Sequence, residues 1–141
     1  MAIPAPFPFS TGQVLTSAAM NSLADFQTWT PTITPQAGAF TTVTTNWARY
    51  AVINELLIAQ LKFTITTIGT GAGIIFVTLP TGITIPNESR IAGSYREQNV
   101  NGLTGVFQQD TTTRVAMHRY DNGAVTVTNG QYSGSFFWEI V

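Results

Sequence analysis

Cysteine is absent from the sequence, and charged residues are scarce. The 141 residues contain no cysteine, so disulfides, thiolate metal sites and thiol catalysis are excluded. Charged side chains make up 9% of the chain, against roughly 25% in an ordinary soluble protein. The formal net charge is −1, with six basic residues. A nucleic-acid-binding protein needs a basic patch or stripe, so we expect no nucleic-acid partner.

Long hydrophobic runs and a basic leader are also missing. No Lys or Arg precedes the first apolar residues, and three prolines interrupt them, whereas a secretory signal needs a basic start and an unbroken apolar core. The longest apolar stretch, 56–65, contains Gln60 and Lys62 and is shorter than the roughly 20 apolar residues of a membrane span. We therefore expect a soluble protein, made in the cytoplasm and not inserted in a membrane.

Threonine, glycine, asparagine and glutamine take the place of the missing charge. Apolar residues reach 44% and aromatic residues 11% of the chain, which is not the composition of a disordered protein. The length suffices for one domain with a real hydrophobic core. Such a composition is poor for helices and typical of all-β proteins that work outside cells or inside assemblies.

The N-terminal residues predict an extended arm and one short helix. Proline alternates with apolar side chains over 3–9, which disfavours a helix and a central strand. Phe7 and Phe9 are too apolar for a free arm, so we expect them to dock on this chain or on a partner. A helix is predicted over Thr16–Gln27, with Thr16 as its N-cap. Its apolar face, which must be buried against another surface, comprises Ala19, Met20, Leu23, Phe26 and Gln27.

From Trp29 onward, β-branched and aromatic residues alternate with turn signals about every 8–12 residues. Strands are predicted over 30–34, 40–45, 47–52, 56–67, 74–79, 91–96, 103–108, 113–120, 124–128 and 135–141. Many short strands without intervening helices indicate antiparallel sheets. The expected fold is all-β: an antiparallel, jelly-roll-like β-sandwich preceded by an extended arm and one short α-helix.

The segment 54–61 fits two patterns. It could be a helix capped by Asn54, but it continues directly into 62–67, which has the composition of a strand. We favour one long strand over 56–67. Alternation then places on one face Leu57, Ala59, Leu61, Phe63 and Ile65.

Side chains with catalytic potential are few. His118 is the sole histidine, and no nucleophile elbow lies near it. A glycosidase needs two carboxylates across a cleft, a pairing that the sequence does not reveal. The glycine-rich stretch 69–73 lacks the lysine of a phosphate-binding loop, and 121–123 has too few ligands for calcium. We expect no enzyme activity, no catalytic residue, no metal and no cofactor.

Arg114, His118 and Tyr120 fall on one face of the predicted strand 113–120. We interpret this face as an exposed or interfacial strip, with a catalytic or metal role as the less favoured alternative. If the strip contacts a glycan receptor, Tyr120 would stack on the sugar and Arg114 would supply hydrogen bonds.

Two predicted strands are apolar on both faces. The strand 135–141 has aromatic residues on both sides, and the strand 56–67 has apolar residues opposite its main apolar face. A small sandwich has little room to bury these second faces, so we predict an oligomer. Two-sided burial within a monomer is the alternative. The predicted interface residues are Leu56, Ile58, Phe136, Phe137 and Trp138.

Two sets of residues resemble tailed-bacteriophage virion proteins. Residues 12–16 (Gly-Gln-Val-Leu-Thr) and 19–23 (Ala-Met-Asn-Ser-Leu) resemble a short N-terminal segment of those proteins. The opening of β-sandwich heads in phage tail-fibre, minor tail and head-fibre proteins is similar to Trp29–Thr34, Arg49-Tyr50, the turn at Ile53-Asn54, and Gln60. Where that family has glycine in the turn, this chain has asparagine, which tolerates the left-handed region.

The resemblance implies a virion location, commonly a homotrimer, and no catalytic residues. Residues 1–28 would attach to a phage capsid or tail protein, and residues 29–141 would form the head. We expect a short fibre or decoration protein whose head binds host surface polysaccharide or only decorates the particle. A free carbohydrate-binding module of cellular origin is the alternative. The predicted attachment residues are Phe7, Phe9, Met20, Leu23 and Phe26.

Overall fold

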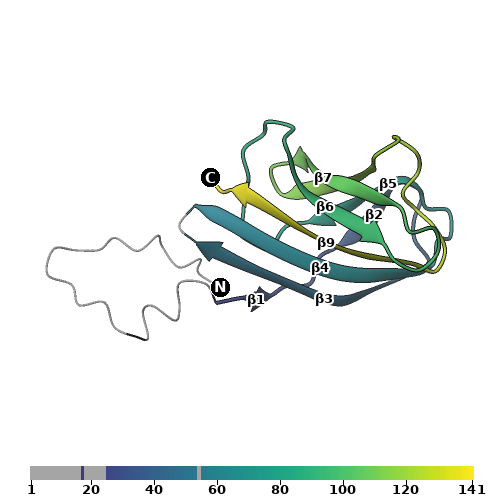
Figure 1. Cartoon of the computed structure of the whole chain (residues 1–141), viewed down its shortest axis with the longest axis horizontal. Helices are drawn as coiled ribbons and strands as arrows, with labels where there is room; N and C mark the ends of the chain where they lie inside the picture. The colour runs from purple at the N-terminus through teal and green to yellow at the C-terminus, as the bar shows by residue number, and fades with distance from the viewer. Residues whose placement is uncertain (1–16, 18–24, 54) are drawn as a thin grey trace, which may run out of the picture.

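The fold is taken from a computed structural model of the whole chain, which describes residues 17, 25–53 and 55–141. These residues form nine β-strands (Figure 1). The strands are β1 (Gln27–Thr28), β2 (Ile33–Ala37), β3 (Thr42–Ile53), β4 (Leu56–Thr67), β5 (Ala72–Thr78), β6 (Ile91–Glu97), β7 (Thr104–Thr111), β8 (Arg114–Arg119) and β9 (Gly130–Glu139).

All nine strands belong to one antiparallel sheet in the order β1-β3-β4-β9-β6-β7-β8-β5-β2. The predicted all-β, antiparallel class is therefore confirmed. The edge strands β1 and β2 are consecutive in sequence, separated only by residues 29–32. So short a link spans less than about 20 Å, so the sheet must curl until its two edges approach each other. Figure 1 shows the two halves facing each other as the layers of a sandwich do.

Trp29 ties the two edges together. Its backbone N–H donates to the carbonyl oxygen of Ala48 in β3, at 3.2 Å. Its indole Nε1 donates to the carbonyl oxygen of Thr78 in β5, also at 3.2 Å. The indole also packs edge-on against Tyr50, with ring centroids 6.0 Å apart. One residue therefore bonds to strands from both halves of the curled sheet.

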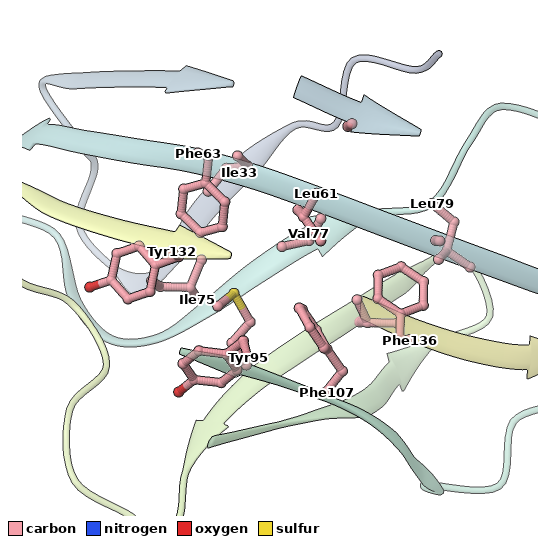
Figure 2. Close-up of a cluster of buried hydrophobic side chains, with 14 of the residues drawn as sticks. Ile33, Leu61, Phe63, Ile75, Val77, Leu79, Tyr95, Phe107, Tyr132 and Phe136 are labelled. Atoms are coloured by element: carbon pink, nitrogen blue, oxygen red, sulfur yellow. The ribbon is translucent and has the colours of Figure 1, made fainter. Parts of the chain in front are cut away.

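The core lies between the two halves (Figure 2). The inner face of β4 is at most 1% exposed along its length and comprises, as predicted, Leu57, Ala59, Leu61, Phe63 and Ile65. Aromatic rings pack in the same core: Phe63 stacks on Tyr132 of the neighbouring strand β9 at 5.0 Å, and Phe107 of β7 packs on Phe136 of β9 at 5.0 Å. Gly134 makes room for these rings, because a Cβ there would lie 2.8 Å from Phe107 and 2.6 Å from the carbonyl oxygen of Ser94.

Several predicted boundaries are wrong. The predicted strands 40–45 and 47–52 are one strand, β3, with a bulge between Thr45 and Trp47. The strand predicted over 30–34 begins later, at Ile33, and the last strand begins earlier, at Gly130. Residues 124–128 form no strand. The predicted helix falls mostly outside the described residues, but its last residue, Gln27, lies in β1.

Candidate functional surfaces

The outer face of the sheet is apolar at one end. Register places Ala51 beside Ile58 and Ile58 beside Phe137, and it places Ile53 beside Leu56. Leu56 is 40% exposed and Phe137 is 58% exposed. An aliphatic or aromatic side chain usually loses most of its exposure on folding. We call this group, Ile53, Leu56, Ile58 and Phe137, the apolar end.

The chain enters the sheet at the same end. β1 runs antiparallel to β3, with Gln27 beside Tyr50. Extending this register by one residue brings Phe26 level with Ala51, in line with the row that contains Phe137. Phe26 is 40% exposed. Phe26, which immediately precedes β1, therefore lies beside the apolar end.

The other end of the same face is polar and basic. One row across the sheet runs from Trp47 on β3 through Lys62 and Ser133 to Arg96 on β6. The next row runs from Arg49 through Gln60 and Ser135 to Ser94. Arg49 and Arg96 are exposed, and Trp47 is 43% exposed. We call Trp47, Arg49, Lys62 and Arg96 the basic end.

The six cations divide into two groups by their partners. Three of them form ion pairs. Arg90 pairs with Glu88 and Glu139, Arg114 pairs with Asp110, and Arg119 pairs with Asp121. Arg49, Lys62 and Arg96 form no ion pair among the described residues, which include all seven carboxylate side chains of the sequence. The cations without a carboxylate partner are therefore the three at the basic end.

Two clefts flank Trp29 beside this face. A cleft of about 340 Å³ is lined by Thr28, Trp29, Thr30, Thr45, Asn46, Trp47, Ala48 and Arg49. A larger cleft, of about 570 Å³, lies between the two sheet edges and is lined mainly by threonines, Trp29, Tyr50 and residues 79–83. The smaller cleft adjoins the basic end and presents an indole, an amide and a guanidinium to one concave surface.

Glu97, next to Arg96 of the basic end, has a structural role. It is 2% exposed, and burial acts to raise its pKa. Hydrogen bonds from backbone N–H groups outweigh that effect and lower the pKa to about 2. The carboxylate thereby holds the loop between β6 and β7. The N–H donors, at 2.7–3.1 Å, belong to Asn99, Val100, Asn101, Gly102 and Gln131.

The structure separates the residues predicted for an oligomer interface. Phe136 and Trp138 are 1% and 3% exposed and belong to the chain's own core. Leu56 and Phe137 are exposed, and Ile58 is partly buried between them on the outer face. Only the last three residues are available to a partner surface.

The predicted attachment residues lie mostly beyond the described part. Phe7, Phe9, Met20 and Leu23 fall outside it, and Phe26 is exposed just before β1. The division into an attachment segment and a head stays a prediction, although residues 27 and 28 pair with β3.

Arg114 and His118 lie in β8 and are partly buried, Tyr120 is exposed beyond the end of the strand, and their role as a glycan contact stays a prediction. Arg114 is engaged by Asp110 and by the ring of Phe76, 4.0 Å from the guanidinium carbon. Tyr120 follows the end of β8 and is 70% exposed. Six residues of extended strand place it roughly 20 Å from Arg114. A single monosaccharide cannot bridge that distance.

The described residues contain neither a metal-binding cluster nor a membrane-spanning helix. No group of three or more His, Asp or Glu side chains in the described chain could hold a metal ion. No helix formed by these residues is long and apolar enough to cross a membrane.

The basic end could have been recognised in part from the sequence. Arg90, Arg114 and Arg119 each have a carboxylate within four residues, whereas Arg49 and Lys62 have none within five. Arg96 is harder to recognise from the sequence, because its neighbour Glu97 suggests that the charge of Arg96 is compensated. In the strand these two side chains lie on opposite faces, Glu97 buried and Arg96 exposed.

Comparison with known proteins gives one informative match. No protein family matches the chain, and no curated protein sequence matches it significantly. The fold is similar to part of the crystal structure of the Dettilon tailspike protein (gp208), with a TM-score of 0.62 and 14% sequence identity. The match covers 85% of this chain and 24% of the tailspike chain. The two proteins therefore share a domain fold, and this chain corresponds to about a quarter of the tailspike.

Proposed function

We propose that the chain is a structural protein of a bacteriophage virion, a short fibre or decoration protein with its β-sheet domain displayed on the particle. The observation that carries this proposal is the fold shared with a tailspike domain over 85% of the chain. The resemblance of residues 12–16 and 19–23 to a short N-terminal segment of phage virion proteins supports the same conclusion.

Attachment is assigned to residues 1–28. Phe7 and Phe9 lie in a proline-rich arm, which loses little conformational entropy when it docks. The segment joins the sheet at β1, beside the apolar end of the outer face. A capsid or tail protein is the proposed docking partner.

Self-association is assigned to the apolar end. Leu56 and Phe137 are exposed on the sheet face, with Ile58 between them in register. Burying such a surface stabilises an interface by roughly 25 cal/mol per Å² of apolar area. A homotrimer, in which three copies pack these faces around one axis, accounts for their exposure in a single chain.

Two uses of the displayed domain remain within this proposal. It either adsorbs to host surface polysaccharide, with Tyr120 as a contact, or only decorates the particle. Tyr120 is exposed enough to stack on a sugar ring. A free carbohydrate-binding module of cellular origin is the alternative function.

The test is incorporation into particles that lack the native protein. The full chain should bind such particles, and a chain starting at Asp25 should keep its β-sheet circular dichroism but bind none. Phe7→Ala combined with Phe9→Ala should reduce occupancy in the same direction. Phe107→Tyr, which adds one hydroxyl group to a fully buried side chain far from the arm in sequence, serves as a control for the effect of altered folding on occupancy. If the truncated chain binds at normal occupancy, attachment lies on the sheet domain and the assignment is wrong.

A further inference from the structure

The basic end differs from every other charged region of the chain. Its three cations have no carboxylate partner, and they come from three different strands. Lys62 and Arg96 lie two strand spacings apart, roughly 10 Å. Lys62 and Arg49 are diagonal neighbours on adjacent strands, roughly 7–8 Å apart. Three like charges at these separations repel one another, in a protein whose other cations are all neutralised locally.

The side chains between the cations are small and polar. The two rows contain Gln60, Ser94, Ser133 and Ser135, and the sole large apolar group among them is Trp47. A protein partner would need an apolar centre in the contact, and this surface offers none beyond one indole. Nucleic acids are bound with many phosphate contacts, and three cations are few for that purpose.

An acidic saccharide fits both sets of groups. The hydroxyl and amide groups match the hydroxyls of a sugar, and the exposed indole of Trp47 offers a flat surface for the apolar face of a pyranose ring. Arg49, Lys62 and Arg96 are spaced so that a chain crossing the strands would place a carboxylate beside each cation. The cleft of about 340 Å³ lined by Trp47 and Arg49 is a concave surface in which the first sugar of the saccharide can lie.

We propose that the basic end binds a carboxylated polysaccharide, laid across β3, β4, β9 and β6 with its first residue in the cleft beside Trp47. Arg49, Lys62 and Arg96 pair with successive carboxylates, and the serine and glutamine side chains bond to ring hydroxyls. The proposed function includes polysaccharide contact at Tyr120, and this inference adds a separate site on the sheet face and the chemical class of the saccharide that it binds.

The experiment is affinity electrophoresis of the full chain in gels containing polygalacturonate, with its methyl ester as the neutral counterpart. The native protein should be retarded by the acid and not by the ester. Retardation should weaken as salt rises, because exposed ion pairs are screened. Lys62→Gln combined with Arg96→Gln should raise the apparent dissociation constant about tenfold, as expected for two exposed charge-assisted contacts.

The matched control is Arg90→Gln. Its counterpart is the single variant Arg96→Gln, which also removes one positive charge from an exposed arginine and should raise the apparent dissociation constant. In the control the lost cation, Arg90, is paired with Glu88 and Glu139. The apparent dissociation constant of the control should equal that of the native protein. Trp47→Ala should weaken binding severalfold without changing net charge, which separates stacking from bulk electrostatics.

Three outcomes overturn the inference. Equal weakening by Arg90→Gln and Arg96→Gln would show an effect of net charge alone. Equal retardation by the acid and the ester would show that the cations take no part. Displacement of the polysaccharide by an equal charge concentration of oligothymidylate would show a general polyanion surface. Each readout uses the isolated protein, so these results do not depend on virion incorporation.

Discussion

The two faces of β4 differ in burial and in polarity. The inward residues are at most 1% exposed and belong to the chain's own hydrophobic core. The outward residues begin apolar at Leu56 and Ile58 and become polar at Gln60 and Lys62. The inner face therefore determines stability, and the outer face carries the residues of both proposed contact surfaces. Determinants of folding and of interaction consequently alternate along a single strand.

The largest expected effect is on the inner face. Phe63→Ala should lower the free energy of unfolding by about 3–5 kcal/mol, because it leaves a cavity beside Tyr132, on which Phe63 stacks. Denaturant unfolding followed by circular dichroism measures this. Lys62→Ala, one residue earlier on the outer face, should change stability by less than about 0.5 kcal/mol. A similar loss of unfolding free energy in both variants would contradict the claim that the inner face of β4 determines stability.

A second effect concerns the neighbours Arg96 and Glu97, which also face opposite ways. Glu97→Gln should destabilise the protein by about 2–3 kcal/mol at neutral pH, because one amide oxygen cannot accept all the N–H bonds that the carboxylate accepts. Arg96→Gln should leave stability unchanged within about 0.5 kcal/mol. Thermal or denaturant unfolding distinguishes the two variants.

The effect of Glu97 should depend on pH in a defined direction. Its pKa is lowered from 4.5 to about 2 on folding, so the unfolded chain binds the proton more tightly. The contribution to stability is therefore fully present above about pH 4.5 and is lost as the pH falls toward 2. The stability difference between the native protein and Glu97→Gln should shrink over this interval. A constant difference from pH 7 to pH 2 would show that the carboxylate charge is not what stabilises the loop.

A third variant should change the oligomeric state of the protein and not the folding of its subunit. Leu56→Ser combined with Phe137→Ser should change the intrinsic stability of the subunit by no more than about 1–2 kcal/mol, because both side chains are exposed. The oligomer should nevertheless dissociate to monomers in analytical ultracentrifugation. Gln60→Ser, farther along the same face of β4, should leave the mass unchanged. A native chain that is monomeric at all concentrations would overturn the trimer proposal.

The smallest expected effect is that of Tyr120→Ala. The side chain is 70% exposed and lies beyond the end of β8, so the melting temperature should stay within about 1 °C. Adsorption to host cells should weaken only if the domain contacts a glycan there. Unchanged adsorption would favour decoration, and a large fall in melting temperature would contradict the placement of Tyr120 on the surface.

The sequence predicted strands best where alternation was long. β4 was predicted with both of its boundaries, because twelve residues alternate in period two. β3 was predicted as two strands, 40–45 and 47–52, whereas in the sheet Asn46 lies at a bulge within one strand and accepts a hydrogen bond from Thr64. Residues 124–128 were predicted as a strand from their β-branched residues and flanking turns, whereas Val125 is buried in the core without joining a ladder.

The start of β9 shows why composition fails elsewhere. Residues 130–135 are glycine, serine and glutamine apart from Tyr132, a composition of low β propensity. They form a strand because β4 and β6 pair with them on both sides. The candidate sites follow the same rule, since the apolar residues of β4 were predicted from the sequence but the three cations of the basic end were not recognised as a group.

The sequence by itself determined the all-β class and the buried face of β4, because both follow from composition and from a period of two residues, which are local properties. Only the tertiary structure decided which strands are neighbours. Lys62 and Arg96 lie 34 positions apart in sequence and share one row because β9, the last strand, inserts between β4 and β6. The local pattern fixes which face each residue takes, but the pairing of distant strands depends on how the whole sheet curls around its core.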